Sequence, residues 1–167
     1  IKVANDQIRR KAGEDVSLYG MGTTMVAATL MGHYLQVANV GDSRLYIVND
    51  EIRQITRDHS LVEEMVRMGG MDETTARNNP DKNIITRAVG ARTEVEVDFF
   101  NEELRPGDLI LMCSDGLTNM LEDEEILKIM KSAYTIREKA LCLIDGANEH
   151  GGKDNIAVII IDAFAKD

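Results

Sequence analysis

The stretch Leu109-Ile110-Leu111-Met112-Cys113-Ser114-Asp115-Gly116 joins an unbroken apolar run to a short polar turn. A continuous run of this length is typical of a strand that is buried on both faces, whereas a strand with one wet face alternates. Such a strand needs cover on both sides, which a pair of stacked sheets with helices outside them would supply. We therefore expect a layered fold in which Asp115 lies directly beyond a core strand.

The part of the chain before this strand is dominated by short alternating segments. In 33–40, for example, Leu35, Val37 and Asn39 share one face. Turn residues such as Asn49-Asp50 separate the segments. The pattern predicts a β-meander whose neighbouring strands pair antiparallel, made of the segments 23–31, 33–40, 45–48 and 51–55.

Helical periodicity appears in two other places. Residues 1–14 have the spacing of an amphipathic helix. The polar stretch 59–83 interrupts the strands, and in it Ser60 and Asp72 stand where helix N-caps are expected, Ser60 with a capping box to Glu63. We interpret this stretch as a helical insertion, and we expect the apolar face of its first helix to consist of Leu61, Val62, Met65 and Val66.

After the insertion the chain returns to strands and then to helices. The pattern predicts strands at 95–100 and 109–113, helices at 122–132 and 136–148, and a last strand at 155–161 that is apolar on both faces. This order favours the α+β class with a mostly antiparallel core. We expect a single domain over 1–167.

Composition narrows the function. The net charge of −10 argues against a nucleic-acid backbone as the main partner. No apolar run approaches the ~20 residues that cross a bilayer, and no signal peptide is recognisable at the start. Cys113 and Cys142 are predicted to be buried, reduced thiols, and without a CxxC motif we do not expect a zinc site. These features favour a cytoplasmic protein. Because the chain begins with Ile1 inside a helical pattern, we expect it to be a fragment.

Three aspartates share one sequence context. Asp42, Asp115 and Asp154 each lie beside an apolar strand, next to Gly, Ser or Asn. A carboxylate at a buried strand end is unfavourable unless a cation pairs with it, and oxygen ligands select hard ions such as Mg²⁺ or Mn²⁺. Taken singly, each is more often a turn or cap residue, although this alternative is weaker for Asp115. The spacing does not show whether the three converge.

Other polar residues carry weaker signals. His59 has the chemistry of a general base, but a histidine directly before a helix more often packs or caps there, and we favour that interpretation. Arg87 and Arg92 are phosphate ligands by type or ordinary surface charges. The loop 20–23 lacks the Lys and the spacing of a Walker A motif, so we interpret it as a bend before a strand.

Six segments in order resemble the metal-dependent protein phosphatases (the PPM or type 2C family), particularly their bacterial members. The matching stretches are GMGTT at 20–24, NVGDSR at 39–44, TRDHSLV at 56–62, NIITRAVG at 83–90, LMCSDGL at 111–117 and GGKDNI at 151–156. Each match is modest alone, but the six in the right order are specific.

The resemblance implies a four-layer fold, with two antiparallel sheets in a sandwich flanked by helices. It also implies hydrolysis of phosphoserine and phosphothreonine by a water activated at two Mn²⁺ or Mg²⁺ ions. On this resemblance Asp115 and Asp154 are metal ligands, and Asp42 helps to hold a third, weaker ion. The insertion 59–83 corresponds to the family's flap. The implied partners are phosphorylated proteins, as substrates shared with a serine/threonine kinase.

The sequence also departs from the family pattern. The phosphate-binding Arg, the Asn-Glu-Asp stretch and the Asp-Gly pair whose Asp bridges both metals do not occur in these residues. We therefore expect a fold that is incomplete at its N-terminus, a fragment that is inactive alone, and exposed strand edges able to pair or swap with a second copy. Two alternatives stay open: a non-catalytic phosphatase-like sensing or binding domain, and a sporulation-E-type relative.

Overall fold

The computed structural model describes residues 1–165, apart from the side chain of Glu73. The backbone forms two compact units. Unit 1 consists of Ile1–Ala27, Ala38–Asp42 and Arg57–Phe99, and unit 2 of Ala28–Val37, Ser43–Thr56 and Phe100–Asp167. The chain contains a three-stranded sheet in the order β1-β2-β5 and a four-stranded sheet in the order β4-β3-β6-β7. Two antiparallel sheets with helices confirm the predicted α+β class.

The four-stranded sheet belongs to unit 2. Its antiparallel strands are β3 (Arg44–Val48), β4 (Ile52–Gln54), β6 (Leu109–Cys113) and β7 (Val158–Asp162). The apolar run that opens the sequence argument is its inner strand β6, in which Cys113 lies opposite Arg44 on one side and Val158 on the other.

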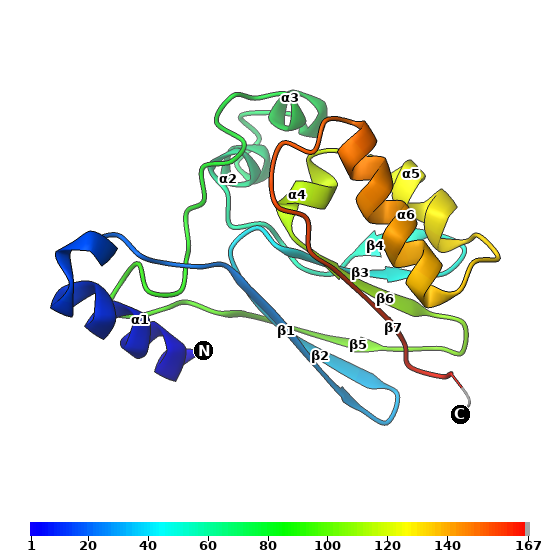
Figure 1. The fold of residues 1–167 in the computed structure, drawn as a ribbon, viewed down its shortest axis with the longest axis horizontal. Coiled ribbons are helices and arrows are strands. Elements are labelled where there is room, and N and C mark those ends of the chain that lie inside the picture. Colours follow the sequence, from blue (N-terminus) through cyan, green and yellow to red (C-terminus); the bar gives the residue numbers. More distant parts are fainter. Residues whose placement is uncertain (166–167) are drawn as a thin grey trace. The chain divides into compact units, whose positions relative to one another are not determined.

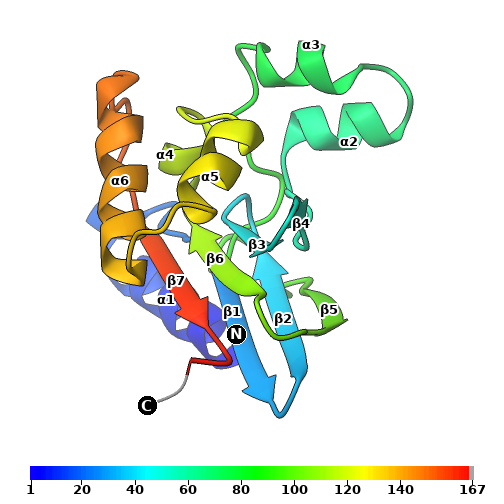
Figure 2. The ribbon, with the colours of Figure 1, turned by 90° about the vertical axis from the view of Figure 1, so that its right-hand side faces the viewer.

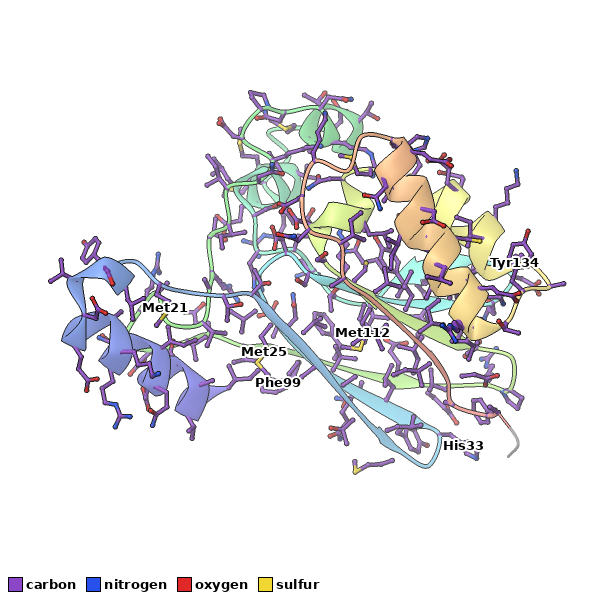
Figure 3. The ribbon with its side chains drawn as sticks, in the orientation of Figure 1. Met21, Met25, His33, Phe99, Met112 and Tyr134 are labelled. Carbon is purple, nitrogen blue, oxygen red and sulfur yellow. The ribbon has the colours of Figure 1, made fainter. Side chains whose placement is uncertain are left out.

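Three helices cover one face of this sheet, as Figures 1 and 2 show: α4 (Asp115–Thr118), α5 (Asp123–Met130) and α6 (Ile136–Glu149). Both longer helices begin with a capping box, formed by Glu122 with Glu125 and by Thr135 with Glu138. Leu111 and Cys113 from the sheet pack with residues of all three helices, so this interface is the main core of unit 2. Tyr134 lies outside it, in the loop between α5 and α6 (Figure 3).

On the other face of the sheet, burial differs between strands β6 and β7. Ile110 is fully buried there, and Met112 also points away from the helices (Figure 3). Ile159 and Ile161 are instead exposed, at 55% and 36%. The prediction of two buried faces is therefore confirmed for the inner strand β6 and wrong for β7. The reason is position, since β7 is the last strand in the sheet order and alternates in burial along its length.

Unit 1 is built around helix α1 (Lys2–Glu14), followed by the 3-10 turn η1 (Val16–Leu18). The helix attaches to a distant loop through the buried Asn5. Its Oδ1 accepts a hydrogen bond from the Gly90 amide at 2.7 Å, and its Nδ2 donates to the Arg92 carbonyl at 3.1 Å. Because Asn5 is 1% exposed, these bonds satisfy a group that water does not reach.

The insertion forms the two short helices α2 (Leu61–Arg67) and α3 (Glu73–Arg77) of unit 1. Both predicted N-caps are confirmed, because the side chains of Ser60 and Asp72 accept hydrogen bonds from the amides of Glu63 and Thr75. Within α2 the predicted apolar face is only partly confirmed. Val62 is buried, but Met65 is 37% exposed.

The three-stranded sheet consists of β1 (Met25–Met31), β2 (Tyr34–Val40) and β5 (Asp98–Glu103), and each strand contains residues of both units. The alternation in β2 is confirmed, with Leu35, Val37 and Asn39 buried. The meander is wrong at one step, because β2 and β3 belong to different sheets. Both edges of β3 are occupied, by β4 and β6, so β2 has no edge of β3 to pair with. The strand predicted at 95–100 begins later, at Asp98.

Candidate metal centre and the turn at Gly41

Asp115 lies where strand β6 ends and helix α4 begins. It is the first residue of α4, after the N-cap Ser114, and it is partly buried. The Asn119 side chain, one turn further along, donates a hydrogen bond to Asp115 Oδ2 at 3.1 Å. The inner strand therefore fixes the backbone of Asp115, and α4 orients its carboxylate.

A tight backbone joint connects this position to the loop that carries Asp154. Ser114 N–H donates to the Ala157 carbonyl at 3.1 Å, and Ala157 N–H donates to Ser114 Oγ at 3.0 Å. Gly116 completes the joint, because a Cβ atom there would lie 2.2 Å from the Asn155 carbonyl oxygen. The two loops consequently lie side by side, and only glycine permits their approach at this point.

Asp154 itself is exposed. Its Oδ1 accepts a hydrogen bond from the Asn155 amide at 2.7 Å, which orients the carboxylate. The structure thus places the predicted ligands Asp115 and Asp154 on adjoining segments of unit 2, at the start of α4 and in the loop before β7. Carboxylate oxygens of this kind suit hard divalent ions. Within residues 1–165 no group of three or more His, Cys, Asp and Glu side chains is arranged to hold a metal ion.

The third predicted ligand, Asp42, belongs to unit 1 and follows a constrained turn. Gly41 has φ of 110°, in the region that favours glycine, and a Cβ atom there would lie 2.4 Å from Thr24 Cγ2. Its amide donates a hydrogen bond to His59 Nδ1 at 3.0 Å, and its carbonyl accepts one from the His59 amide at 3.0 Å.

The other ring nitrogen of His59 faces an ionic cluster in the same unit. His59 Nε2 lies 3.2 Å from Asp98 Oδ2, and Arg87 Nη1 donates to Asp98 Oδ1 at 2.9 Å. Burial disfavours the charged carboxylate of Asp98, but the hydrogen bonds from His59 and Arg87 and the positive charge of Arg87 outweigh it and hold the pKa of Asp98 below its usual value. Arg87 is thus engaged by Asp98 and also by Glu96, at 3.3 Å.

The remaining candidates lie elsewhere. His33 stacks on Phe164 with ring centroids 5.5 Å apart, and His150 ends helix α6. His59 packs before α2, as the favoured interpretation predicts. Both cysteines are free thiols; Cys113 is buried as predicted, whereas Cys142 is only partly buried. Sequence reasoning missed Asp98. In 95–98 acidic residues alternate with valines, and this pattern is typical of a strand whose acidic face is in contact with solvent.

These motifs and this fold match known proteins. A family model described as protein phosphatase 2C matches residues 2–92, more than half of the chain. The chain belongs to the protein phosphatase 2C family. A curated relative, the serine/threonine phosphatase stp of Listeria innocua, is 46% identical over 163 residues, which cover 97% of this chain and 65% of the relative.

Solved structures agree on the family fold. The serine/threonine phosphatase Stp1 of Staphylococcus aureus superimposes with a TM-score of 0.93 at 38% identity, over 95% of this chain and 63% of that one. The catalytic domain of the serine/threonine phosphatase PstP, solved with two manganese ions, gives a TM-score of 0.84 at 36% identity, over 93% and 65%. The chain therefore spans about 65% of the length of the Listeria relative that it matches.

One further property concerns membranes. Among the described residues, the helices are all too short or too polar to span a bilayer.

Proposed function

We propose that the protein carrying this chain is a metal-dependent protein serine/threonine phosphatase, and that Asp115 and Asp154 bind Mn²⁺ or Mg²⁺. The observation that carries the proposal is the joint of Ser114 and Gly116 with the 155–157 backbone, which sets the start of α4, with Asp115, beside the loop that carries Asp154. Membership of the protein phosphatase 2C family and the manganese ions bound by PstP support it.

In this proposal the chain's own groups act by positioning. Asn119 and the Asn155 amide each donate a hydrogen bond to one of the two carboxylates, and such outer hydrogen bonds orient a carboxylate that binds a metal ion. Bound divalent ions would lower the pKa of a water and stabilise charge on the phosphoryl group. Phosphoryl transfer depends mainly on such positioning and charge stabilisation, and less on covalent chemistry by the protein.

Substrates and partners follow from the family. We propose phosphoserine and phosphothreonine residues of proteins, modified by a serine/threonine kinase, as the substrates. Asp42 is proposed as a ligand of a third, weaker ion. The segment 59–83 is proposed to shape access as a flap, since its two short helices lie between Ser60 and Ile85, which form a β-bridge that closes the segment at its base.

The test uses the complete gene product with a phosphothreonine peptide and Mn²⁺. Asp115→Asn and Asp154→Asn are each expected to lower kcat/KM at least ~100-fold and to weaken Mn²⁺ binding in calorimetric titration. Asp145→Asn, an exposed carboxylate on α6, is the matched control and should leave both unchanged. Wild-type turnover and Mn²⁺ affinity in both site variants would contradict the proposal.

One observation favours a second candidate function. Because the described residues hold no group of three or more ligating side chains, the 167-residue chain by itself is proposed to turn over no substrate. A phosphatase-like domain that binds phosphoproteins without hydrolysis has the same property. The complete gene product discriminates: Mn²⁺-dependent release of phosphate supports the enzyme, and phosphopeptide binding without release supports the binding domain.

A further inference from the structure

We infer that His59 is a positioning residue that ties the Gly41–Asp42 turn to Asp98, and so sets Asp42 for cation binding. The inference rests on the proposed role of Asp42 as a metal ligand. It concerns the base of the flap rather than the flap's helices.

The first step is the contact with the turn. His59 binds both polar backbone groups of Gly41, with its ring Nδ1 accepting from the amide and its own amide donating to the carbonyl. The Asn39 side chain adds a bond to the same carbonyl at 3.3 Å. Since Thr24 occupies the space beside Gly41, the peptide that leads into Asp42 is held on its polar and apolar sides.

The second step is the proton arrangement of the ring. An amide N–H only donates, so Nδ1 of His59 must present its lone pair and the ring hydrogen lies on Nε2. Nε2–H then donates to Asp98, whose carboxylate also accepts from Arg87. Arg87 Nη1 lies 3.3 Å from His59 Nε2, but two donors do not bond each other, so Asp98 is the shared acceptor. The carboxylate fixes the ring's tautomer and orientation, as outer carboxylates do for functional histidines.

The third step is burial. His59 is 5% exposed, and Gly41 is buried. Water therefore cannot replace the ring as acceptor for the Gly41 amide, and loss of Nδ1 leaves a buried donor unsatisfied. The turn should then relax toward another arrangement, and Asp42 moves with it.

The fourth step is the link to the flap. Ser60, the next residue, caps helix α2, and the Thr86 amide donates to the His59 carbonyl at 2.8 Å. The two ends of the 59–83 insertion thus meet at His59. A change in the base of the flap is expected to reach Asp42 through this residue.

Two substitutions separate the two ring nitrogens. In His59→Asn the amide oxygen takes the place of Nδ1 and accepts from Gly41, while the link to Asp98 is lost. In His59→Gln the side chain reaches the place of Nε2 and donates to Asp98, but Gly41 loses its acceptor. A role in overall packing alone predicts similar effects for both, whereas the positioning role predicts that His59→Asn retains the turn.

The experiment measures Mn²⁺ binding to the complete gene product by calorimetry and electron paramagnetic resonance. The binding event that is lost in Asp42→Asn identifies the ion that depends on Asp42. Affinity for that ion is expected to fall ~10-fold or more in His59→Gln, the loss typical of outer-shell residues of metal sites, and by clearly less in His59→Asn. Unchanged affinity in His59→Gln, or equal losses in both variants, would overturn the inference.

A second readout does not depend on metal. In the ¹⁵N-labelled complete gene product, the His59 ring is expected to show its hydrogen on Nε2. The chemical shift of the Gly41 amide should change strongly in His59→Gln and weakly in His59→Asn. The opposite tautomer would contradict the inference even if a variant fails to fold. If Asp42→Asn leaves Mn²⁺ binding intact, the proposed metal role of Asp42 fails, while the nuclear magnetic resonance result still tests the turn.

Discussion

At the scale of single residues, two glycines decide how closely functional loops approach. Gly41 needs a positive φ and has Thr24 beside it, whereas Gly116 adopts ordinary helical geometry and is limited only by the Asn155 carbonyl. A substitution at Gly116 therefore introduces a steric overlap without backbone strain. It therefore gives the cleaner test of the joint between the Asp115 and Asp154 loops.

Gly116→Ala should destabilise the chain by about 1–3 kcal/mol, because the new methyl group overlaps the Asn155 carbonyl and the loop must shift. Urea unfolding measures the loss, and amide chemical shifts of 153–157 report the displacement. Gly13→Ala is the matched control, since nothing lies within 4 Å of its Cβ position near the end of α1, and it should be neutral or stabilise by up to ~1 kcal/mol. Unchanged stability and unchanged shifts in Gly116→Ala would disprove the joint.

Asp98 should make stability depend on pH. Its pKa is lowered in the folded state, so its ionised form stabilises the fold above the unfolded value near ~3.9, and the contribution disappears as pH falls through the lower folded pKa. Asp98→Asn is therefore expected to be less stable than wild type at pH 7, with a difference that shrinks by pH 3. Urea unfolding at both pH values tests this, with Asp145→Asn as the control. A difference that is constant with pH would refute it.

The sequence indicates some of these residues and hides others. Asp115 stands out because it directly follows an apolar run. The bond between His59 and Asp98 joins residues far apart in the chain, and nothing in either local pattern indicates the partner. The joint at Gly116 is equally invisible, because a glycine needed for close approach looks like any turn glycine.

At the scale of elements, local patterns predict what a segment forms better than what it pairs with. Helices α1, α5 and α6 follow their periodicity, and α4 was missed because four residues are too short for a periodic signal. The link from β2 to β3 is wrongly predicted as a step within one antiparallel meander. Its residues 41–43 are turn-like, and turn chemistry alone does not say whether the next strand joins the same sheet.

The two faces of strand β7 differ in burial, and substitutions on each face can test this difference. Ile160 packs against the helix-covered core, whereas its neighbour Ile159 is 55% exposed. In the 167-residue chain, Ile160→Thr is expected to lower the free energy of unfolding by about 1–3 kcal/mol and Ile159→Thr by less than ~1 kcal/mol. Urea unfolding of both variants measures the contrast. Equal losses would mean that the outer face of β7 is covered in solution.

At the scale of the whole molecule, the question is whether this chain alone contains enough ligands to bind a metal ion. The described residues form two compact units, and the prediction of one domain over 1–167 stays a prediction. The net charge of −10 favours the approach of cations in general. Specific binding requires several ligands around one ion, and among residues 1–165 no group of three or more His, Cys, Asp and Glu side chains is arranged to hold one.

The 167-residue chain should consequently gain little stability from Mn²⁺. A ligand at a concentration equal to its Kd stabilises a fold by only about 0.4 kcal/mol, whereas one at 100 times Kd gives about 2.7 kcal/mol. For a chain of this size we expect a rise in Tm of about 1–2 °C in millimolar Mn²⁺, measured by calorimetry at matched ionic strength.

The double variant Asp115→Asn, Asp154→Asn distinguishes the pair from diffuse charge. If the pair binds the ion, this variant loses the small rise, whereas Asp145→Asn keeps it. A large rise that saturates at micromolar Mn²⁺ would contradict the expectation, because it would require a complete coordination shell within this chain. A rise that survives the double variant would place the ion elsewhere, since the proposed ion site consists of these two carboxylates beside the joint of Ser114 and Gly116 with the 155–157 backbone.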